Sequence, residues 1–186
     1  MKLAIIFPGI GYHVDKPLLY YAKKLAVSYG YEIVEVEYKN FSKDIKGNRE
    51  KMLEAFQFGV EQTEEILEEI DFSKYEQILC ISKSIGTAIA SVYTSRHQLE
   101  TKNIFYTPVI ESFEVMEQEG IVFHGTSDPW AKTKDVEEEC KKKNLPLVEI
   151  KDANHSLETG NAIKDIKNLK KLMKKTKKYI EQIKEQ

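Results

Sequence analysis

Short apolar runs rich in β-branched residues alternate along this chain with longer segments in which apolar residues recur every three or four positions. The first run covers residues 3–7, and the next segment, residues 15–29, has apolar side chains at helical spacing and ends before Gly30. This alternation is the signature of repeated β–α units around a parallel sheet. The pattern therefore predicts an α/β fold.

The same pattern continues to the end of the chain. It predicts six strands, over residues 3–7, 32–38, 78–81, 104–106, 121–123 and 147–150. It predicts helices over residues 15–29, 49–70, 85–96, 132–143 and 161–184. Because no Gly/Ser-rich or Pro-rich linker and no internal repeat interrupts it, residues 1–186 are expected to form one domain. We expect a three-layer αβα sandwich with a mainly parallel, doubly wound, six-stranded sheet.

Some elements allow finer predictions. The strand over 32–38 alternates glutamates with apolar residues, which indicates a position near an edge of the sheet. The closing helix is expected to place its apolar residues on one side, namely Ile163, Ile166, Leu169, Leu172, Met173, Ile180 and Ile183. Cys80 is expected to be buried in a strand and Cys140 to be a surface thiol, and these two form no disulfide framework or zinc site.

The charge balance gives no global field for an anionic partner. The 28 Lys and Arg residues face 30 Asp and Glu residues, a net charge of −2. The lysines of residues 164–178 are interpreted as a solvated helix face. Uncharged stretches reach only about a dozen residues, and the first apolar run meets Pro8 too early for a signal peptide. We expect a cytoplasmic protein with neither a nucleic-acid nor a membrane partner.

Function is expected in the loops after the strands. Right-handed crossovers bring the carboxyl ends of parallel strands to one edge of the sheet, where such sheets bind ligands. The loop after residues 78–81 reads Ser82-Lys83-Ser84-Ile85-Gly86 and runs directly into a predicted helix. It is similar to the G-x-S-x-G turn, whose central serine is a nucleophile, with Ser82 in place of the first glycine. Taken alone, the turn favours an N-cap serine over a nucleophile.

Two further loops change that interpretation. Residues 124–130, after one predicted strand, read H-G-T-S-D-P-W, and residues 152–158, after the next, read D-A-N-H-S-L-E. A serine, an acid and a histidine thus follow three different strands in the order Ser, Asp, His. We expect Ser84, Asp128 and His155 to converge as nucleophile, orienting acid and general base.

These motifs resemble those of the α/β-hydrolase superfamily. H-G-x-x-D-P at residues 124–129 and N-H-S-L-E at residues 154–158 are the most specific part of a resemblance that covers nearly the whole chain. It points to the small, lidless branch that includes dienelactone-hydrolase-like proteins and minimal serine esterases. The resemblance implies an α/β-hydrolase fold without the usual first two strands and without a lid. Only residues 107–119 fill the interval where family lids insert, so an open site is expected.

Acyl transfer also needs fixed N–H donors for the oxyanion of the transition state. The residue after the nucleophile, Ile85, is expected to supply one from its backbone. The resemblance to the family's H-G-x-G loop implies that Ile10 supplies the other, although Pro8 stands where the family often has histidine. An ordinary βα turn is the alternative interpretation of residues 9–11.

Residues at the mouth of this site are candidates for substrate contact. They are Gly9, Gly11, Tyr12, His13 and Trp130. His13 also fits an exposed loop histidine, and Trp130 fits a packing residue as well as it fits a residue lining a cleft.

Other polar residues fit this chemistry less well. His124 is expected to support the acid loop from beneath, and Asp152 is a rival acid in the same loop as His155. The chain has no H-x-x-x-H or C-x-x-C spacing, and residues 8–11 lack the third glycine of a dinucleotide fingerprint. We therefore expect no metal and no cofactor.

The residues together favour a serine hydrolase that cleaves a carboxylic ester or related acyl bond of a small molecule through an acyl-enzyme. Two alternatives remain open at this point. One is a non-catalytic binding or scaffold protein that retains the hydrolase fold. The other is an acyltransferase that uses the same three residues with an acceptor other than water.

Overall fold

The computed structural model describes residues 1–41, 45 and 47–184. Within them, six strands form one sheet in the order β2-β1-β3-β4-β5-β6, and each neighbouring pair is parallel. The strands are β1 (Lys2–Phe7), β2 (Tyr31–Glu35), β3 (Gln77–Lys83), β4 (Lys102–Tyr106), β5 (Gly120–Gly125) and β6 (Leu147–Ile150). The α-helices are α1 (Pro17–Ser28), α2 (Arg49–Leu67), α3 (Ile85–Arg96), α4 (Thr133–Lys142) and α5 (Ala162–Lys184), and the 3-10 helices are η1 (Phe72–Lys74) and η2 (Ile110–Glu114).

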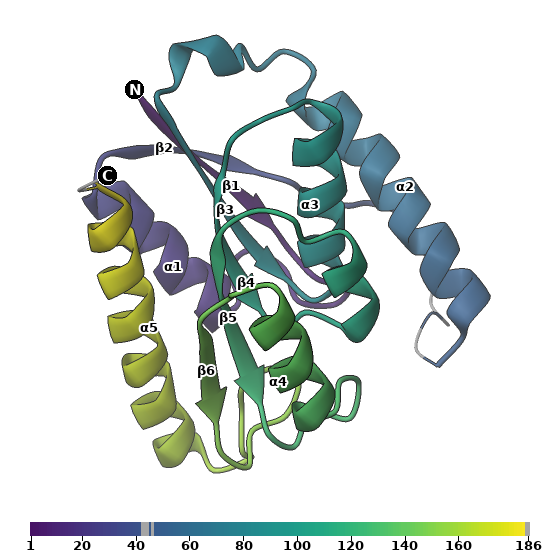
Figure 1. Ribbon diagram of the computed structural model, residues 1–186, viewed down its shortest axis with the longest axis vertical. Coiled ribbons are helices and arrows are strands. Elements are labelled where there is room, and N and C mark those ends of the chain that lie inside the picture. The colour runs from purple at the N-terminus through teal and green to yellow at the C-terminus, as the bar shows by residue number, and fades with distance from the viewer. Residues whose placement is uncertain (42–44, 46, 185–186) are drawn as a thin grey trace.

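Helices cover both faces of the sheet. α1 and α5 pack side by side on one face, and α2, α3 and α4 lie on the other (Figure 1). Successive residues of a strand point to opposite faces, and β1 shows the effect of this alternation. Ala4 and Ile6 belong to the core beneath α1 and α5, whereas Ile5 and Phe7 pack beneath α2 and α3. The predicted three-layer, doubly wound sandwich is confirmed, and its sheet is parallel throughout.

The strand order reverses at β1, which fixes where the loops meet. The chain passes from β1 to β2 on one side and returns to β3 on the other, and a crevice at such a reversal is the usual ligand site of an open α/β sheet. Phe7, the last residue of β1, lies in register with Ser82 of β3. The loops that follow these two strands therefore start side by side. β2 occupies one edge of the sheet as predicted, although it covers Tyr31–Glu35 rather than residues 32–38.

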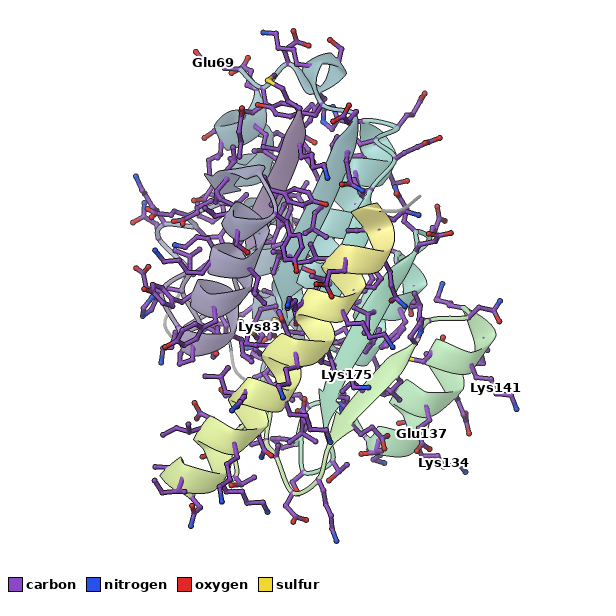
Figure 2. All side chains as sticks on the ribbon, turned by 90° about the vertical axis from the view of Figure 1, so that its left-hand side faces the viewer. Glu69, Lys83, Lys134, Glu137, Lys141 and Lys175 are labelled. Carbon is purple, nitrogen blue, oxygen red and sulfur yellow. The ribbon has the colours of Figure 1, made fainter. Side chains whose placement is uncertain are left out.

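The prediction for the closing helix is wrong in part. Leu172, Ile180 and Ile183 are buried against the sheet, but Ile163 is 65 % exposed and Ile166 is 63 % exposed. At about 100° per residue, Ile163 lies on the opposite side of α5 from Leu172, so the apolar residues do not share one face. The lower end of α5 also extends away from the sheet (Figure 2). None of the helices in the described part of the chain has the length and apolar character needed to cross a membrane.

The prediction for Cys140 is also wrong, whereas that for Cys80 is confirmed. Cys80 is fully buried in β3, and Cys140 is only 3 % exposed although charged residues surround it in sequence. Cys140 stands one helical turn after Val136, and both pack into the core beneath α4. The thiol therefore lies on the inner side of an otherwise charged helix.

Gly86 allows α3 to begin close to the end of β1. A Cβ atom at this position would lie 2.5 Å from the carbonyl oxygens of both Phe7 and Pro8, which is shorter than any normal contact. Since both obstructing atoms belong to the backbone, a side chain at residue 86 would force the strand and the helix apart.

We expect Gly86→Ala to destabilise the protein by about 2–3 kcal/mol because of this overlap. In an unobstructed helix the same change would instead stabilise by up to about 1 kcal/mol. Gly30→Ala is the control: Gly30 has φ of +83° with no atom within 4 Å of an added Cβ, so only a backbone cost of about 1–2 kcal/mol is expected. Urea unfolding of the three proteins measures the difference, and an unchanged or raised stability of Gly86→Ala would contradict the proposed close approach.

Candidate active site

Ser84 is the only residue between β3 and α3. Its φ of 55° and ψ of −127° lie in a region that residues other than glycine seldom adopt. Three hydrogen bonds hold this conformation: the Ser84 amide donates to the carbonyl of Tyr106 at 3.0 Å, and the Ser84 carbonyl accepts from the amide of Thr87 at 2.9 Å and from its hydroxyl at 2.7 Å. The sharp turn keeps the side chain at the edge of the sheet, outside the strand ladder.

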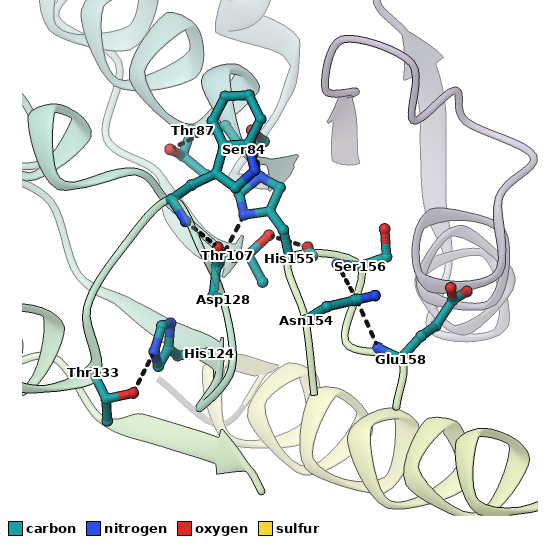
Figure 3. A network of polar contacts seen from close by, with 11 residues as sticks. Ser84, Thr87, Thr107, His124, Asp128, Thr133, Asn154, His155, Ser156 and Glu158 are labelled. Carbon is teal, nitrogen blue, oxygen red and sulfur yellow. Dashed lines mark hydrogen bonds and ion pairs between the residues drawn. The ribbon is translucent and has the colours of Figure 1, made fainter. Parts of the chain in front are cut away.

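A chain of hydrogen bonds joins three loops at this edge (Figure 3). His155 Nε2 lies 2.8 Å from the hydroxyl oxygen of Ser84, and His155 Nδ1 lies 2.7 Å from Oδ2 of Asp128. An ionised carboxylate can only accept, so Nδ1 carries a proton and donates it to Asp128. In the neutral imidazole, Nε2 is then the acceptor for the Ser84 hydroxyl. The structure thus brings together the serine, acid and histidine that the sequence placed after three separate strands.

Asp128 is buried and well supplied with donors. Its side chain has no exposed surface, and the amide of Trp130 donates to Oδ1 at 2.9 Å. Burial acts to raise the pKa of Asp128, but the hydrogen bond and the charge of His155, together with the Trp130 amide, outweigh it and lower the pKa. The carboxylate is therefore ionised at neutral pH and orients the imidazole.

The loop that carries His155 is fixed from both sides. The hydroxyl of Thr107 donates to the carbonyl of His155 at 2.9 Å. Asn154 Oδ1 accepts from the amides of Ser156 at 2.8 Å and Glu158 at 3.2 Å. Neither Thr107 nor Asn154 was assigned a role from the sequence, although both stand in loops after strands.

Trp130 lies directly against the histidine. Its ring stacks on the imidazole of His155 with a centroid distance of 5.6 Å and an interplanar angle of 26°. Because Trp130 is 38 % exposed, one part of the indole packs on His155 and another faces solvent beside the site. Trp130 therefore packs on His155 and remains partly exposed, and its contact with substrate stays a prediction.

The loop after β1 forms a tight turn beside Ser84. Gly9 and Tyr12 exchange backbone hydrogen bonds of 3.2 and 3.1 Å, and Gly11 has φ of +72°. A Cβ at Gly9 would lie 3.1 Å from that of Ser84, so the turn rests against the serine. The hydrogen bonds that close the turn do not use the amide of Ile10. Ile85 is the first residue of α3, and the first amides of a helix have no acceptor within it.

The remaining candidates lie in different surroundings. Tyr12 is turned into the core, where its hydroxyl accepts from the amide of Leu18 at 3.2 Å and burial raises its pKa to about 12, so its side chain does not offer the expected substrate contact. His13 is exposed. The rival acid Asp152 pairs with Lys164 at 3.3 Å on the surface, rather than with His155.

His124 lies beneath the acid loop. It is fully buried at the end of β5, with Nε2 3.0 Å from the hydroxyl of Thr133, the first residue of α4 (Figure 3). Burial lowers the pKa of His124 and favours its neutral form. The contact ties the strand that precedes Asp128 to the helix that follows it.

One residue beside Ser84 was given no role from the sequence. Lys83, the last residue of β3, is only 1 % exposed, and Figure 2 shows it between α1 and α5. Its Nζ lies 5.1 Å from the centre of the Tyr12 ring. Burial lowers the pKa of Lys83 to about 7, against the opposing effect of the negative charge of Asp128. The only signal in the sequence is a lysine at the end of an otherwise apolar strand.

Within residues 1–41, 45 and 47–184, no group of three or more His, Cys, Asp or Glu side chains lies in a position to hold a metal ion.

The burial of Lys83 predicts a pH-dependent effect on stability. Between pH about 7 and about 10.5 the unfolded chain binds one more proton than the folded protein, so the free energy of unfolding of the wild type rises with pH over this range. We expect Lys83→Met to be more stable than the wild type by about 2 kcal/mol at pH 6, because it removes a buried charge. The advantage should shrink as the pH approaches 10. Urea unfolding at a series of pH values tests this, and a constant difference would show that Lys83 keeps its ordinary pKa in the folded protein and stays charged over this range.

Comparison with known proteins identifies the fold. No family model matches this chain, and no curated protein matches its sequence. Many solved structures do match, among them one each from Coxiella burnetii, Xanthomonas campestris and Butyrivibrio proteoclasticus. The TM-score is 0.67 for an alpha-beta serine hydrolase homologue from Coxiella burnetii, at 16 % identity over 94 % of this chain and 84 % of that one. The TM-score is 0.72 for a serine hydrolase without lid from Xanthomonas campestris, at 11 % identity over 97 % of this chain and 81 % of that one.

The third structure is Est1E from Butyrivibrio proteoclasticus with ferulic acid bound. Its TM-score is 0.70, at 11 % identity over 98 % of this chain and 89 % of that one. Identities this low establish a shared fold rather than a shared substrate. The six-stranded parallel sheet, its flanking helices and these matches together show that the chain has the fold of the small α/β hydrolases.

Proposed function

We propose that this protein is a serine hydrolase that cleaves a carboxylic ester or a related acyl bond through an acyl-enzyme. One observation carries the proposal: the continuous hydrogen-bonded chain from the Ser84 hydroxyl through His155 to the buried carboxylate of Asp128. A nucleophile, a base and an orienting acid in contact are what acyl transfer from serine requires. The shared fold of the serine hydrolases above supports the same conclusion.

The first half of the reaction follows from this geometry. Ser84 attacks the acyl carbon while Nε2 of His155 takes the hydroxyl proton, and Asp128 stabilises the imidazolium that forms. The amides of Ile85 and Ile10 are the proposed donors to the oxyanion of the tetrahedral intermediate. His155 then returns its proton to the leaving alcohol, and Ser84 remains acylated.

The second half uses water in place of the alcohol. His155 takes a proton from the water that attacks the acyl carbon, and the Ser84 oxygen leaves with that proton as the carboxylic acid is released. The fixed backbone conformation of Ser84 holds its side-chain oxygen in the same position during acylation and deacylation, which favours both steps.

The proposed substrate is a small acyl compound that reaches the site from solvent. The β4–β5 connection, where family lids insert, forms η2 and buries Phe113 and Met116 in the core near α3 and α4 instead of extending over Ser84. The exposed part of Trp130 offers an apolar surface beside His155 for the acyl or alcohol group. The ferulic acid in Est1E is an aromatic acid, which supports a test of aromatic as well as aliphatic esters.

Covalent labelling tests the nucleophile directly. We expect a fluorophosphonate probe to label the purified wild type, because it reacts only with an activated serine. Ser84→Ala should show no labelling, and Ser82→Ala, which changes the other serine of the turn, should label normally. Absence of labelling in the wild type, or equal labelling of Ser84→Ala, would leave a binding protein with this fold as the better explanation.

The role of Asp128 is tested against the acid of the neighbouring loop. We expect Asp128→Asn to lower kcat for p-nitrophenyl esters by roughly 10³- to 10⁴-fold, because the NH2 group of asparagine donates to His155 Nδ1 and so favours the wrong tautomer. Asp152→Asn should change kcat less than about twofold, since Asp152 pairs with Lys164 on the surface. The p-nitrophenyl esters measured for both variants should include the acetate, the butyrate and the cinnamate. Equal losses in the two variants would contradict the assignment.

A further inference from the structure

Lys83 is unusual because a charged side chain is buried next to the proposed nucleophile. It precedes Ser84 directly, and its side chain is as buried as the largest apolar residues of the core. Within the described residues its ammonium makes no hydrogen bond or ion pair, and it lies over the Tyr12 ring with Nζ 5.1 Å from the ring centre. A cation over a ring face is attracted by it, and more strongly when water is excluded.

Tyr12 is the residue that closes the turn proposed to bind the oxyanion. Its backbone pairs with Gly9, and its hydroxyl accepts from the amide of Leu18 in the first turn of α1. The turn also lies on Lys83 itself, because a Cβ at Gly9 would be 3.2 Å from the Lys83 carbonyl oxygen and 3.5 Å from its Cγ. The backbone and stem of Lys83 therefore support one end of the turn, and its ammonium contacts the ring at the other end.

Several ionisable groups surround this contact. The carboxylate of Asp128, in the β5–α4 loop, favours the protonated form of Lys83, and burial opposes it. Tyr106 of β4 is the register partner of Lys83, and Glu158 of the β6–α5 loop acts on the charge of Tyr12. His155 is bonded to Asp128, and Lys16 lies 5.8 Å from the centre of the same Tyr12 ring. Among the described groups, the carboxylate that favours the charged form of Lys83 is thus that of Asp128, which is already hydrogen-bonded to His155.

We propose that Lys83 is a positioning residue for the oxyanion-binding turn. Its buried ammonium, through the Tyr12 ring, holds residues 9–12 against the nucleophile strand, and it does so only while it is protonated. This inference rests on the proposed serine-hydrolase function. Lys83 itself contacts neither substrate nor the reacting atoms. The position of the proposed oxyanion amide of Ile10 would then depend on whether the Lys83 side chain is protonated.

The proposal has a consequence for pH dependence. His155 acts as a base only when it is neutral, so activity is expected to be lost in acid solution. Because burial lowers the pKa of Lys83 to about 7, the ammonium loses its charge in weakly alkaline solution and its attraction to the Tyr12 ring disappears. Activity should therefore fall again on the alkaline side, which gives a bell-shaped profile.

The test is the pH profile of kcat and KM for a p-nitrophenyl ester in the wild type, Lys83→Met and Lys83→Arg. We expect kcat of the wild type to fall about tenfold from its maximum to pH about 9, with KM changed little. Lys83→Met should have kcat about tenfold below the wild-type maximum and no alkaline fall, although it folds more stably. Lys83→Arg keeps its charge and should retain activity at pH about 9.

Lys16→Met is the matched control, because Lys16 contacts the same ring from an exposed position away from the nucleophile strand. Its profile should match that of the wild type. An alkaline fall that persists in both Lys83→Met and Lys83→Arg would overturn the inference. That result is distinct from failure of the proposed function, in which the fluorophosphonate probe would not label Ser84 of the wild type at any pH.

Discussion

The close contact between the end of β1 and the start of α3 is the constraint on which the site depends. Gly86 lies against the carbonyl oxygens of Phe7 and Pro8, and Gly9 lies against Ser84, so the chain can turn from β3 into α3 only through one strained residue. Because neighbouring backbone groups fix Ser84 at positive φ, its hydroxyl stays at the strand edge within 2.8 Å of His155. The strain is offset by core packing on both faces of the sheet.

Electrostatics is the second constraint. Two buried charges among the described residues near this turn are stabilised to different degrees. Asp128 accepts hydrogen bonds from His155 and from the Trp130 amide, whereas the ammonium of Lys83 lies over the Tyr12 ring in the field of Asp128. An unpaired buried charge lowers stability, and proteins retain such groups mainly where function requires them. This difference is why the carboxylate stays ionised near neutral pH while the ammonium titrates there.

Much of the fold could be predicted from the sequence, and the errors have clear physical causes. Strand and helix positions follow from periodicity, since the sequence spacing of apolar residues reflects backbone geometry. The prediction failed for Ile163 and Ile166 because apolar residues that do not keep a strict three- or four-residue spacing can lie on opposite sides of a long helix. It failed for Cys140 because charged neighbours on the outer side of α4 masked a narrow inner face.

The sequence by itself determined the β–α alternation, and hence that Ser84, Asp128 and His155 follow strand ends that share one edge of the sheet. Only the tertiary structure decided the strand order, the hydrogen bonds among those side chains, and the burial of Lys83 and Tyr12 beside them. The physical reason is that local periodicity specifies which side of an element is apolar but not which element covers it. Contacts between loops that are distant in sequence form only when the whole core packs.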